Sequence, residues 1–266
     1  PSPPTRSRVS RSELHASGEG EQKWERAERA SATGTAQQHP SRPAAYLRAI
    51  FAIVRKDVAA EVRSKELVSA MLIFSLLVVL IFNFALELDR EARENVAAGV
   101  LWVTFTFAGT LGLNRTFAAE KDRGSFDGLL LAPVDRSAIY FGKLIGTLLF
   151  MLLVEVIVMP VFSVLYGISL FKPMLFVVVL LGTVGYAGVG TLLASMAVHT
   201  RARDVMLPIL LFPVTVPVVI AAVKASTGIL LASEWGDIAV WLNILLVYDT
   251  IFIAVAFMVF DYLVEE

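Results

Sequence analysis

Residues 67–86 read LVSAMLIFSLLVVLIFNFAL, an uncharged and strongly apolar run between Glu66 and Glu87. A helix of roughly 20 such residues is long enough to cross the approximately 30 Å of hydrocarbon in a bilayer. Further apolar runs of similar length follow, and together they predict six spans, at about 67–87, 96–118, 138–163, 174–198, 205–223 and 238–260. The loops between the runs are short, so we expect an all-α, polytopic membrane protein with one compact bundle.

The composition of the 266 residues supports this class. Hydrophobic residues make up 56% of the chain and charged residues only 18%, and the mean hydropathy is +0.69, well outside the range of a soluble globular domain. The chain has no cysteine. This excludes a disulfide framework, a thiolate metal site and covalent attachment of haem through cysteine.

Two segments precede the first span. Residues 1–43 are rich in Ser, Pro, Ala, Gln and Arg without apolar periodicity, which predicts a disordered tail. Residues 44–66 alternate apolar and basic positions at helical spacing and predict an amphipathic interfacial helix beside anionic headgroups, although a helix packed on a soluble partner has the same pattern. The domain division is therefore tail 1–43, interfacial helix 44–66 and transmembrane domain 67–264.

The distribution of lysine and arginine predicts the orientation. With the amino end in the cytoplasm and residues 1–43 left out of the count, twelve lysines and arginines fall on the cytoplasmic side and four on the other. The twelve are Arg48, Arg55, Lys56, Arg63, Lys65, Arg115, Lys121, Arg123, Arg136, Lys143, Arg201 and Arg203, and the four are Arg90, Arg93, Lys172 and Lys224. Both termini are thus predicted to be cytoplasmic.

The segment Gly124–Pro133 lies between the second and third spans, on the predicted cytoplasmic side. Phe126, Leu129 and Leu130 share one helical face and Asp127 lies on another, which predicts a short amphipathic helix at the membrane surface. Pro133 would end it, because proline lacks the amide hydrogen and clashes with the preceding turn. A partner pressing on this helix would move both attached spans. An ordinary loop whose leucines dip into lipid is the alternative.

Several polar or helix-breaking residues lie inside the predicted spans. Glu155, in the third span, is costly at that depth and is interpreted either as a packing residue with a hydrogen bond or as a proton relay or substrate contact. Gly182, Gly185, Gly188 and Gly190 crowd the fourth span and favour close helix packing, with a flexible joint as the alternative.

Pro208, Pro213 and Pro217 predict a kink or break in the fifth span, which should then border a protein interface or a pathway. Residues 225–237 predict a short interfacial helix on the outer side, with Trp235 at headgroup depth.

The sequence has no Gly-x-x-x-x-Gly-Lys-Ser/Thr loop, so no nucleotide site of that type is expected in this chain. Its membrane domain has a single histidine, His199, which is too few for a histidine metal cluster or a pair of axial haem ligands. We therefore predict no catalytic, cofactor-binding or metal-binding residues, no enzyme activity and no nucleic-acid partner.

A resemblance to a known family now emerges from separated motifs that occur in order. Glu120, Gly124, Leu129, Leu130 and Pro133 resemble the cytoplasmic coupling segment of six-span, ABC-2-like exporter permeases. The stretches 98–103, 113–117, 127–128, 131–133, 180–183 and 208–217, with Lys143, resemble the cytochrome c maturation protein B family, the haem exporter B subunits. The chain departs from the family at Ser125-Phe-Asp-Gly-Leu, where relatives have an Asp-Gly-Ser-Leu-Glu pattern.

The resemblance implies a permease subunit in the bacterial inner membrane that takes part in haem delivery to c-type cytochromes. It implies a separate ABC ATPase that binds ATP, a haem-handling membrane subunit, a small single-span subunit and a periplasmic haem chaperone, with haem as the transported substrate. Because an ATPase dimer has two grooves, a second copy of this chain is expected. Phe126, Leu129 and Leu130 would enter a groove, and Glu120, Arg123 and Asp127 would contact its rim. The alternatives are a permease for a lipid, polysaccharide or drug, and a scaffold for the ATPase that carries no substrate.

Overall fold

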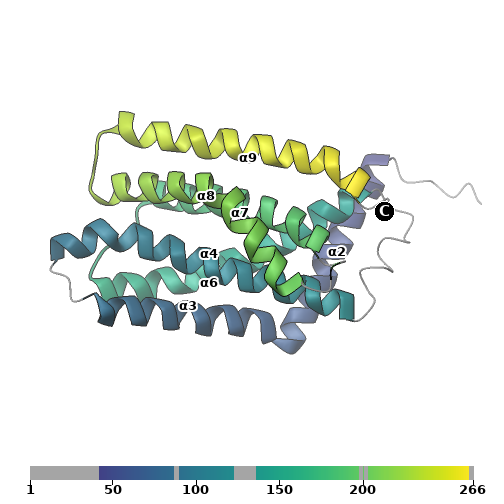
Figure 1. Cartoon of the computed structure of the whole chain (residues 1–266), viewed down its shortest axis with the longest axis horizontal. Helices are drawn as coiled ribbons and strands as arrows, with labels where there is room; N and C mark the ends of the chain where they lie inside the picture. Colours follow the sequence, from purple (N-terminus) through teal and green to yellow (C-terminus); the bar gives the residue numbers. More distant parts are fainter. Residues whose placement is uncertain (1–41, 87–89, 123–135, 198–199, 201–202, 264–266) are drawn as a thin grey trace, which may run out of the picture. The chain divides into compact units, whose positions relative to one another are not determined.

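The computed structural model describes residues 42–86, 90–122, 136–197, 200 and 203–263. Within these ranges the chain forms seven helices (Figure 1): α2 (Arg42–Ser64), α3 (Glu66–Ala85), α4 (Arg90–Asp122), α6 (Arg136–Tyr166), α7 (Pro173–Ala197), α8 (Arg203–Leu230) and α9 (Trp235–Leu263). The six from α3 to α9 are long and apolar enough to cross a membrane. The predicted class, an all-α polytopic membrane protein, is confirmed.

Helix α7 packs against α4, α6, α8 and α9, and α4 and α6 also pack against four helices each, whereas α3 packs against α4 and α6. Small residues make this possible. A Cβ atom on Gly182 would collide with the Trp102 ring, and one on Gly190 would collide with Leu113. Side chains of α4 therefore occupy the space that any side chain at Gly182 or Gly190 would need. This confirms the predicted packing role of these two glycines.

Helix α2 lies at the end of the bundle where α3 begins and α9 ends (Figure 1). Part of its apolar stripe faces away from the protein: the exposed side chains include Leu47, Phe51 and Val62. No helix among the described residues covers these side chains, which agrees with the predicted position of α2 against lipid headgroups.

At the opposite end, the loop between α6 and α7 caps α8. Lys172 Nζ donates hydrogen bonds to the carbonyl oxygens of Ile229 (2.8 Å) and Leu230 (3.1 Å), the last residues of α8. A lysine in this place satisfies carbonyls that have no partner within their own helix. The link joins the start of α7 to the end of α8.

The short interfacial helix predicted at 225–237 is wrong. Helix α8 continues to Leu230, and α9 begins at Trp235 after a short turn. The reason is that this part of α8 packs inside the bundle. Ser226 is fully buried and accepts a hydrogen bond of 3.0 Å from the Trp102 indole nitrogen on α4.

All three prolines of the fifth span lie inside α8, so a complete break of this helix does not occur. The ribbon of α8 instead changes direction along its course (Figure 1). Of the two predicted outcomes, a kink or a break, the helix thus has the kink. Next to Pro213, the Val214 carbonyl accepts a hydrogen bond of 2.8 Å from the Tyr248 hydroxyl on α9. This part of α8 thus contacts α9 on one face, whereas Pro213 and Pro217 themselves are exposed, and the predicted role of the three prolines stays a prediction.

Candidate functional site

The segment predicted to couple the chain to an ATPase joins α4 to α6. Helix α4 ends at Asp122 and α6 begins at Arg136, both at the end of the bundle where α2 lies (Figure 1). Glu120 is on the last turn of α4. The other residues predicted to act here lie outside the described residues: Arg123, Phe126, Asp127, Leu129, Leu130 and Pro133. Their roles stay predictions.

A buried ion pair joins α2 to α6, two turns after α6 begins. Lys143 Nζ on α6 lies 2.8 Å from Asp57 Oδ2 on α2, and Lys143 is only 1% exposed. The second Asp57 oxygen lies 3.3 Å from Lys56 Nζ, whose side chain is 44% exposed. A buried lysine is costly unless its charge is paired and hydrogen-bonded, so the contact with Asp57 helps to offset the cost of burying Lys143.

Two glycines on α6 let α2 approach closely enough for this pair to form. A Cβ atom on Gly142 would lie 2.9 Å from two carbons of the buried Ile53 side chain, closer than such atoms normally come. A Cβ atom on Gly146 would lie 3.4 Å from Asp57 Oδ2. Ile53 and Asp57 are four residues apart on α2, and Gly142 and Gly146 are four residues apart on α6. Each pair lies on one face of its helix, and the two faces contact each other.

Sequence reasoning placed Lys143 among the cytoplasmic cations and did not identify Asp57. The available signal was the pair of glycines flanking Lys143 at a spacing of four. Such a pair on an apolar helix indicates close approach of another helix. It does not say which helix approaches, because α2 is separated from α6 by two spans in the sequence.

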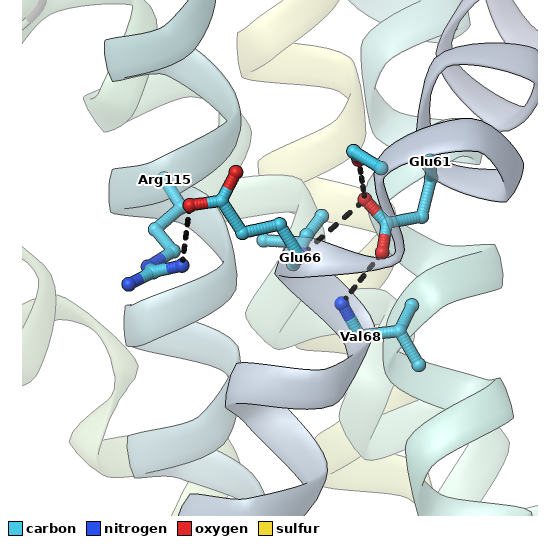
Figure 2. Close-up of polar contacts among 6 residues, drawn as sticks. Glu61, Glu66, Val68 and Arg115 are labelled. Carbon is cyan, nitrogen blue, oxygen red and sulfur yellow. Dashed lines mark hydrogen bonds and ion pairs between the residues drawn. The ribbon is translucent and has the colours of Figure 1, made fainter.

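The connection from α2 to α3 is a single residue with a defined geometry (Figure 2). Lys65 has a left-handed backbone (φ 54°, ψ 16°), which turns the chain between the two helices. The Glu61 carboxylate then accepts hydrogen bonds from the first turn of α3, from Val68 N at 2.8 Å and Leu67 N at 3.4 Å. These amides have no partner within α3, so Glu61 acts as its cap.

An exposed ion pair lies beside this junction. Glu66 Oε1, at the start of α3, is 3.5 Å from Arg115 Nη1 on α4. Both side chains are well exposed, and such pairs contribute roughly 0–1 kcal/mol. The Glu61 cap therefore fixes the junction more than this ion pair does.

In the middle of α6, Glu155 is 2% exposed and lies against α7. Thr183 Oγ1 donates a hydrogen bond of 2.8 Å to Glu155 Oε1. Among the described residues, Oε2 has no partner. The Thr183 contact fits the packing interpretation of Glu155.

Asp249 on α9 is a second carboxyl group buried in the bundle. It is 6% exposed and lies against Gly185 of α7, where a Cβ atom would collide with Asp249 Oδ1. Neither of its carboxyl oxygens has a hydrogen-bond partner among the described residues. Glu155 and Asp249 therefore contact α7 near the same level, two residues apart along its sequence, from α6 and α9.

Tyrosine hydroxyls add polar contacts between the spans. Tyr186 of α7 donates to the Thr106 carbonyl of α4 at 2.8 Å, and Tyr140 of α6 donates to the Gly188 carbonyl of α7 at 3.0 Å. In an apolar bundle such hydrogen bonds hold helices together where hydrophobic burial cannot. Within the described ranges, no group of three or more His, Asp or Glu side chains could hold a metal ion.

Comparison with known proteins identifies the family. The family model described as "CcmB protein" matches residues 48–262, which takes in α2 and all six membrane helices to within a few residues of either end. The chain belongs to the CcmB protein family. The resemblance stated from its motifs is thus confirmed.

Curated relatives in the CcmB family carry the name Heme exporter protein B. The protein of Rhodobacter capsulatus is 30% identical over 170 residues, which cover 64% of this chain and 78% of the relative. The protein of Pseudomonas aeruginosa is 26% identical over 168 residues (62% and 75%). The protein of Bradyrhizobium diazoefficiens is 24% identical over 185 residues (69% and 83%).

Proposed function

We propose that this chain is the membrane permease subunit of an ABC-type complex that exports haem for c-type cytochrome maturation, driven by a separate ATPase subunit. The observation that carries the proposal is the CcmB family match over residues 48–262 together with relatives named Heme exporter protein B. Six helices able to span a membrane support the permease role. Haem is the proposed substrate, and ATP would bind to the partner.

The coupling segment is the proposed contact with the ATPase. Phe126, Leu129 and Leu130 insert into a groove of the ATPase, and Pro133 ends the inserted helix. Glu120, Arg123 and Asp127 contact the rim of the groove. The location supports this role, because the segment connects α4 and α6 and any displacement of it acts on both helices.

The proposed assembly contains two copies of this chain, one for each groove of an ATPase dimer. A haem-handling membrane subunit and a small single-span subunit complete it. The complex resides in the bacterial inner membrane, with both termini of this chain in the cytoplasm. The excess of basic residues at the α2 end supports this orientation.

Among the intramembrane candidates, we assign Glu155 to packing between α6 and α7. Its hydrogen bond from Thr183 supports this assignment over a proton relay. Pro208, Pro213 and Pro217 shape α8 along its interface with α9, supported by the hydrogen bond between Tyr248 and the Val214 carbonyl.

Affinity purification of the complete chain from detergent-solubilised membranes tests the proposal. We expect an ABC ATPase and a haem-binding membrane protein to co-purify. Recovery of an ATPase with a sugar-, lipid- or drug-related enzyme instead of a haem protein would favour another substrate and contradict the proposal.

Replacing Leu129 and Leu130 by Asp tests the coupling segment. Because charged side chains cannot enter an apolar groove without losing hydration, we expect holocytochrome c formation to fall to background while the chain still inserts into the membrane. The matched control is Leu231→Asp, an exposed leucine in the turn between α8 and α9 at the opposite end. Normal holocytochrome levels in the double variant would refute the assigned contact.

A further inference from the structure

Asp249 of α9 is a buried ionisable residue to which the proposed function gives no role. It lies about halfway along α9 (Trp235–Leu263), and its side chain is only 6% exposed. Neighbouring positions of α9 that face outward carry exposed apolar side chains, namely Leu246, Val247 and Ile251. Asp249 therefore lies at a level of the helix where lipid hydrocarbon surrounds the bundle.

The Asp249 carboxyl group lies where α7, α8 and α9 meet. Its Oδ1 atom occupies the space that a Cβ atom on Gly185 of α7 would need, and Val218 Cγ2 of α8 would lie 3.0 Å from the same Cβ atom. Val218 is almost fully buried. Neither oxygen of the carboxyl group has a hydrogen-bond partner among the described residues. Gly185 thus makes room for the carboxyl group, and its surroundings are apolar.

The described part of α6, α7 and α8, the helices packed against α9, supplies no counter-charge to Asp249. Lys143, the buried cation of α6, is bound to another carboxylate, and Lys224 of α8 is exposed. The neighbouring Tyr248 hydroxyl donates its hydrogen bond to the Val214 carbonyl. The other titratable residues of these four helices are Arg136, Tyr140, Glu155, Tyr166, Tyr186, Arg203, Asp204, Asp237, Asp261 and Tyr262.

We propose that Asp249 is a proton-binding site that fastens α9 to α7. The carboxyl group holds a proton while α9 is packed on Gly185, as in this structure. When α9 moves away from α7 and water reaches the group, its O–H bond breaks, the electron pair stays on the carboxylate, and a water molecule accepts the proton. The inference goes beyond the proposed function, because it does not depend on which substrate the chain carries.

The surroundings of Asp249 select a proton as the ligand. A carboxylate in an apolar place without a counter-charge is strongly disfavoured, whereas the protonated group carries no charge. A metal cation such as calcium or magnesium takes about six or more oxygen ligands. Within the described ranges no group of three or more His, Asp or Glu side chains could hold one. A bound proton needs only the carboxyl group itself.

Glu155 provides the internal comparison. It contacts Thr183 of α7, and two residues turn a helix by about 200°, so Glu155 and Asp249 lie on opposite sides of α7. Thr183 Oγ1 donates a hydrogen bond of 2.8 Å to Glu155. Asp249 has no such donor among the described residues. The packing of α9 on α7 is therefore tied to protonation at Asp249 more closely than the packing of α6 on α7 is at Glu155.

Proton binding and the packing of α9 on α7 favour each other by linkage. The packed form binds one proton that the water-exposed form has released, since an ordinary aspartate is ionised above about pH 4. Raising the pH therefore favours separation of the two helices, by up to about tenfold in the equilibrium constant for each pH unit. Asp249→Asn keeps the shape of the side chain without its charge, so it should keep α9 packed at every pH.

Infrared spectroscopy of the full chain in lipid vesicles tests protonation, because a protonated carboxyl group and a carboxylate absorb at different frequencies. We expect a protonated carboxyl band near neutral pH that shifts when the chain contains isotope-labelled aspartate, and that Asp249→Asn removes. The matched control Glu155→Gln should leave this aspartate band in place. If no protonated aspartate band is found, or if Asp249→Asn leaves it unchanged, the proposal is wrong.

A cysteine at position 253 reports separation of the two helices. A Cβ atom on Gly188 of α7 would lie 4.0 Å from Ile253 Cγ1, and the chain has no other cysteine. We expect Ile253→Cys to react with a water-soluble maleimide faster with Asp249 present than with Asp249→Asn, with a ratio that grows by up to about tenfold for each pH unit. Val255→Cys, on the exposed face of α9, is the control and should react equally in both backgrounds. Equal rates for Ile253→Cys in the two backgrounds at every pH would overturn the proposal.

Two of these measurements remain decisive if Asp249→Asn does not fold. The isotope-labelled wild type still shows whether a protonated aspartate is present, and the ratio of the maleimide rates of Ile253→Cys and Val255→Cys should still rise with pH. A ratio that stays constant would contradict the proposal. Neither assay uses haem or an ATPase, so their failure would leave the permease assignment intact, and a failure of the co-purification test would leave this inference intact.

Discussion

Two buried ionisable side chains of α6, Lys143 and Glu155, have partners of different kinds. Near its start, Lys143 meets an opposite charge, Asp57, on a helix that lies at the end of the bundle. Three turns later, Glu155 meets only a neutral hydroxyl, from Thr183 on a neighbouring span. At the end of the bundle a buried charge lies beside an opposite charge, whereas in the middle of α6 the carboxyl group has a hydroxyl partner that requires no charge.

The largest effect is expected at the Lys143 end. Lys143→Met leaves the Asp57 carboxylate with the exposed Lys56 beside it, so the free energy of unfolding should fall by at most the roughly 3–5 kcal/mol that a fully uncompensated buried charge costs. Thermal unfolding in detergent, followed by circular dichroism, measures this. The double variant Asp57→Leu, Lys143→Met is the control and should recover most of the loss, because it removes both charges of the pair. If Lys143→Met is as stable as the wild type, the ion pair with Asp57 does not contribute more to stability than the hydrogen bond of Glu155 does.

An intermediate effect is expected at Gly185, where the third buried ionisable side chain, Asp249, approaches α7. Gly185→Ala places a methyl group where Asp249 Oδ1 lies, and such overpacking typically costs about 1–3 kcal/mol of unfolding free energy. The same unfolding assay applies, and adding Asp249→Ala should relieve the clash.

The matched glycine for this experiment is Gly99 on α4, which has no atom within 4 Å of an added Cβ. Gly99→Ala should be neutral or stabilising by up to about 1 kcal/mol, because alanine is the better helix former. If both substitutions behave alike, the contact between Asp249 and Gly185 does not constrain α7.

The smallest effect is expected at Glu155. Glu155→Gln keeps an oxygen that accepts the Thr183 hydrogen bond, so the free energy of unfolding should change by at most about 1 kcal/mol, the net value of one neutral hydrogen bond. Haem transfer should be unchanged if Glu155 serves packing. If Glu155→Gln has normal stability but no haem transfer, the Glu155 carboxyl group takes part in the transport step, whereas Lys143 serves structure.

The spans could be predicted because their signal is local. The first predicted span, 67–87, corresponds to α3 at Glu66–Ala85, and the fourth, 174–198, to α7 at Pro173–Ala197. Apolar runs of this length have few alternatives to membrane helices. The predicted ends fail where helices extend beyond the apolar run, as in α4, which begins at Arg90 where the prediction began at 96.

What could not be predicted depends on partners distant in sequence. The small polar residues of 225–230 favour the start of a surface helix, but Ser226 is buried and bonded to the Trp102 ring of α4. In the same way, the charges of α2 indicate an amphipathic helix without revealing that Asp57 contacts α6 and Glu61 contacts α3. Local periodicity identifies a helix face, and only the packed bundle decides which residue on it is covered.

The Lys172 cap at the far end of α8 has a consequence for how the bundle can open. This side chain links the start of α7 to the end of α8, on the side of the bundle away from α2. At the other side the chain itself joins the two helices, because only five residues separate Ala197 from Arg203. Since α7 and α8 are held at both ends, we expect them to move as a pair relative to the other helices, and a molecule that crosses the bundle would pass between this pair and another helix.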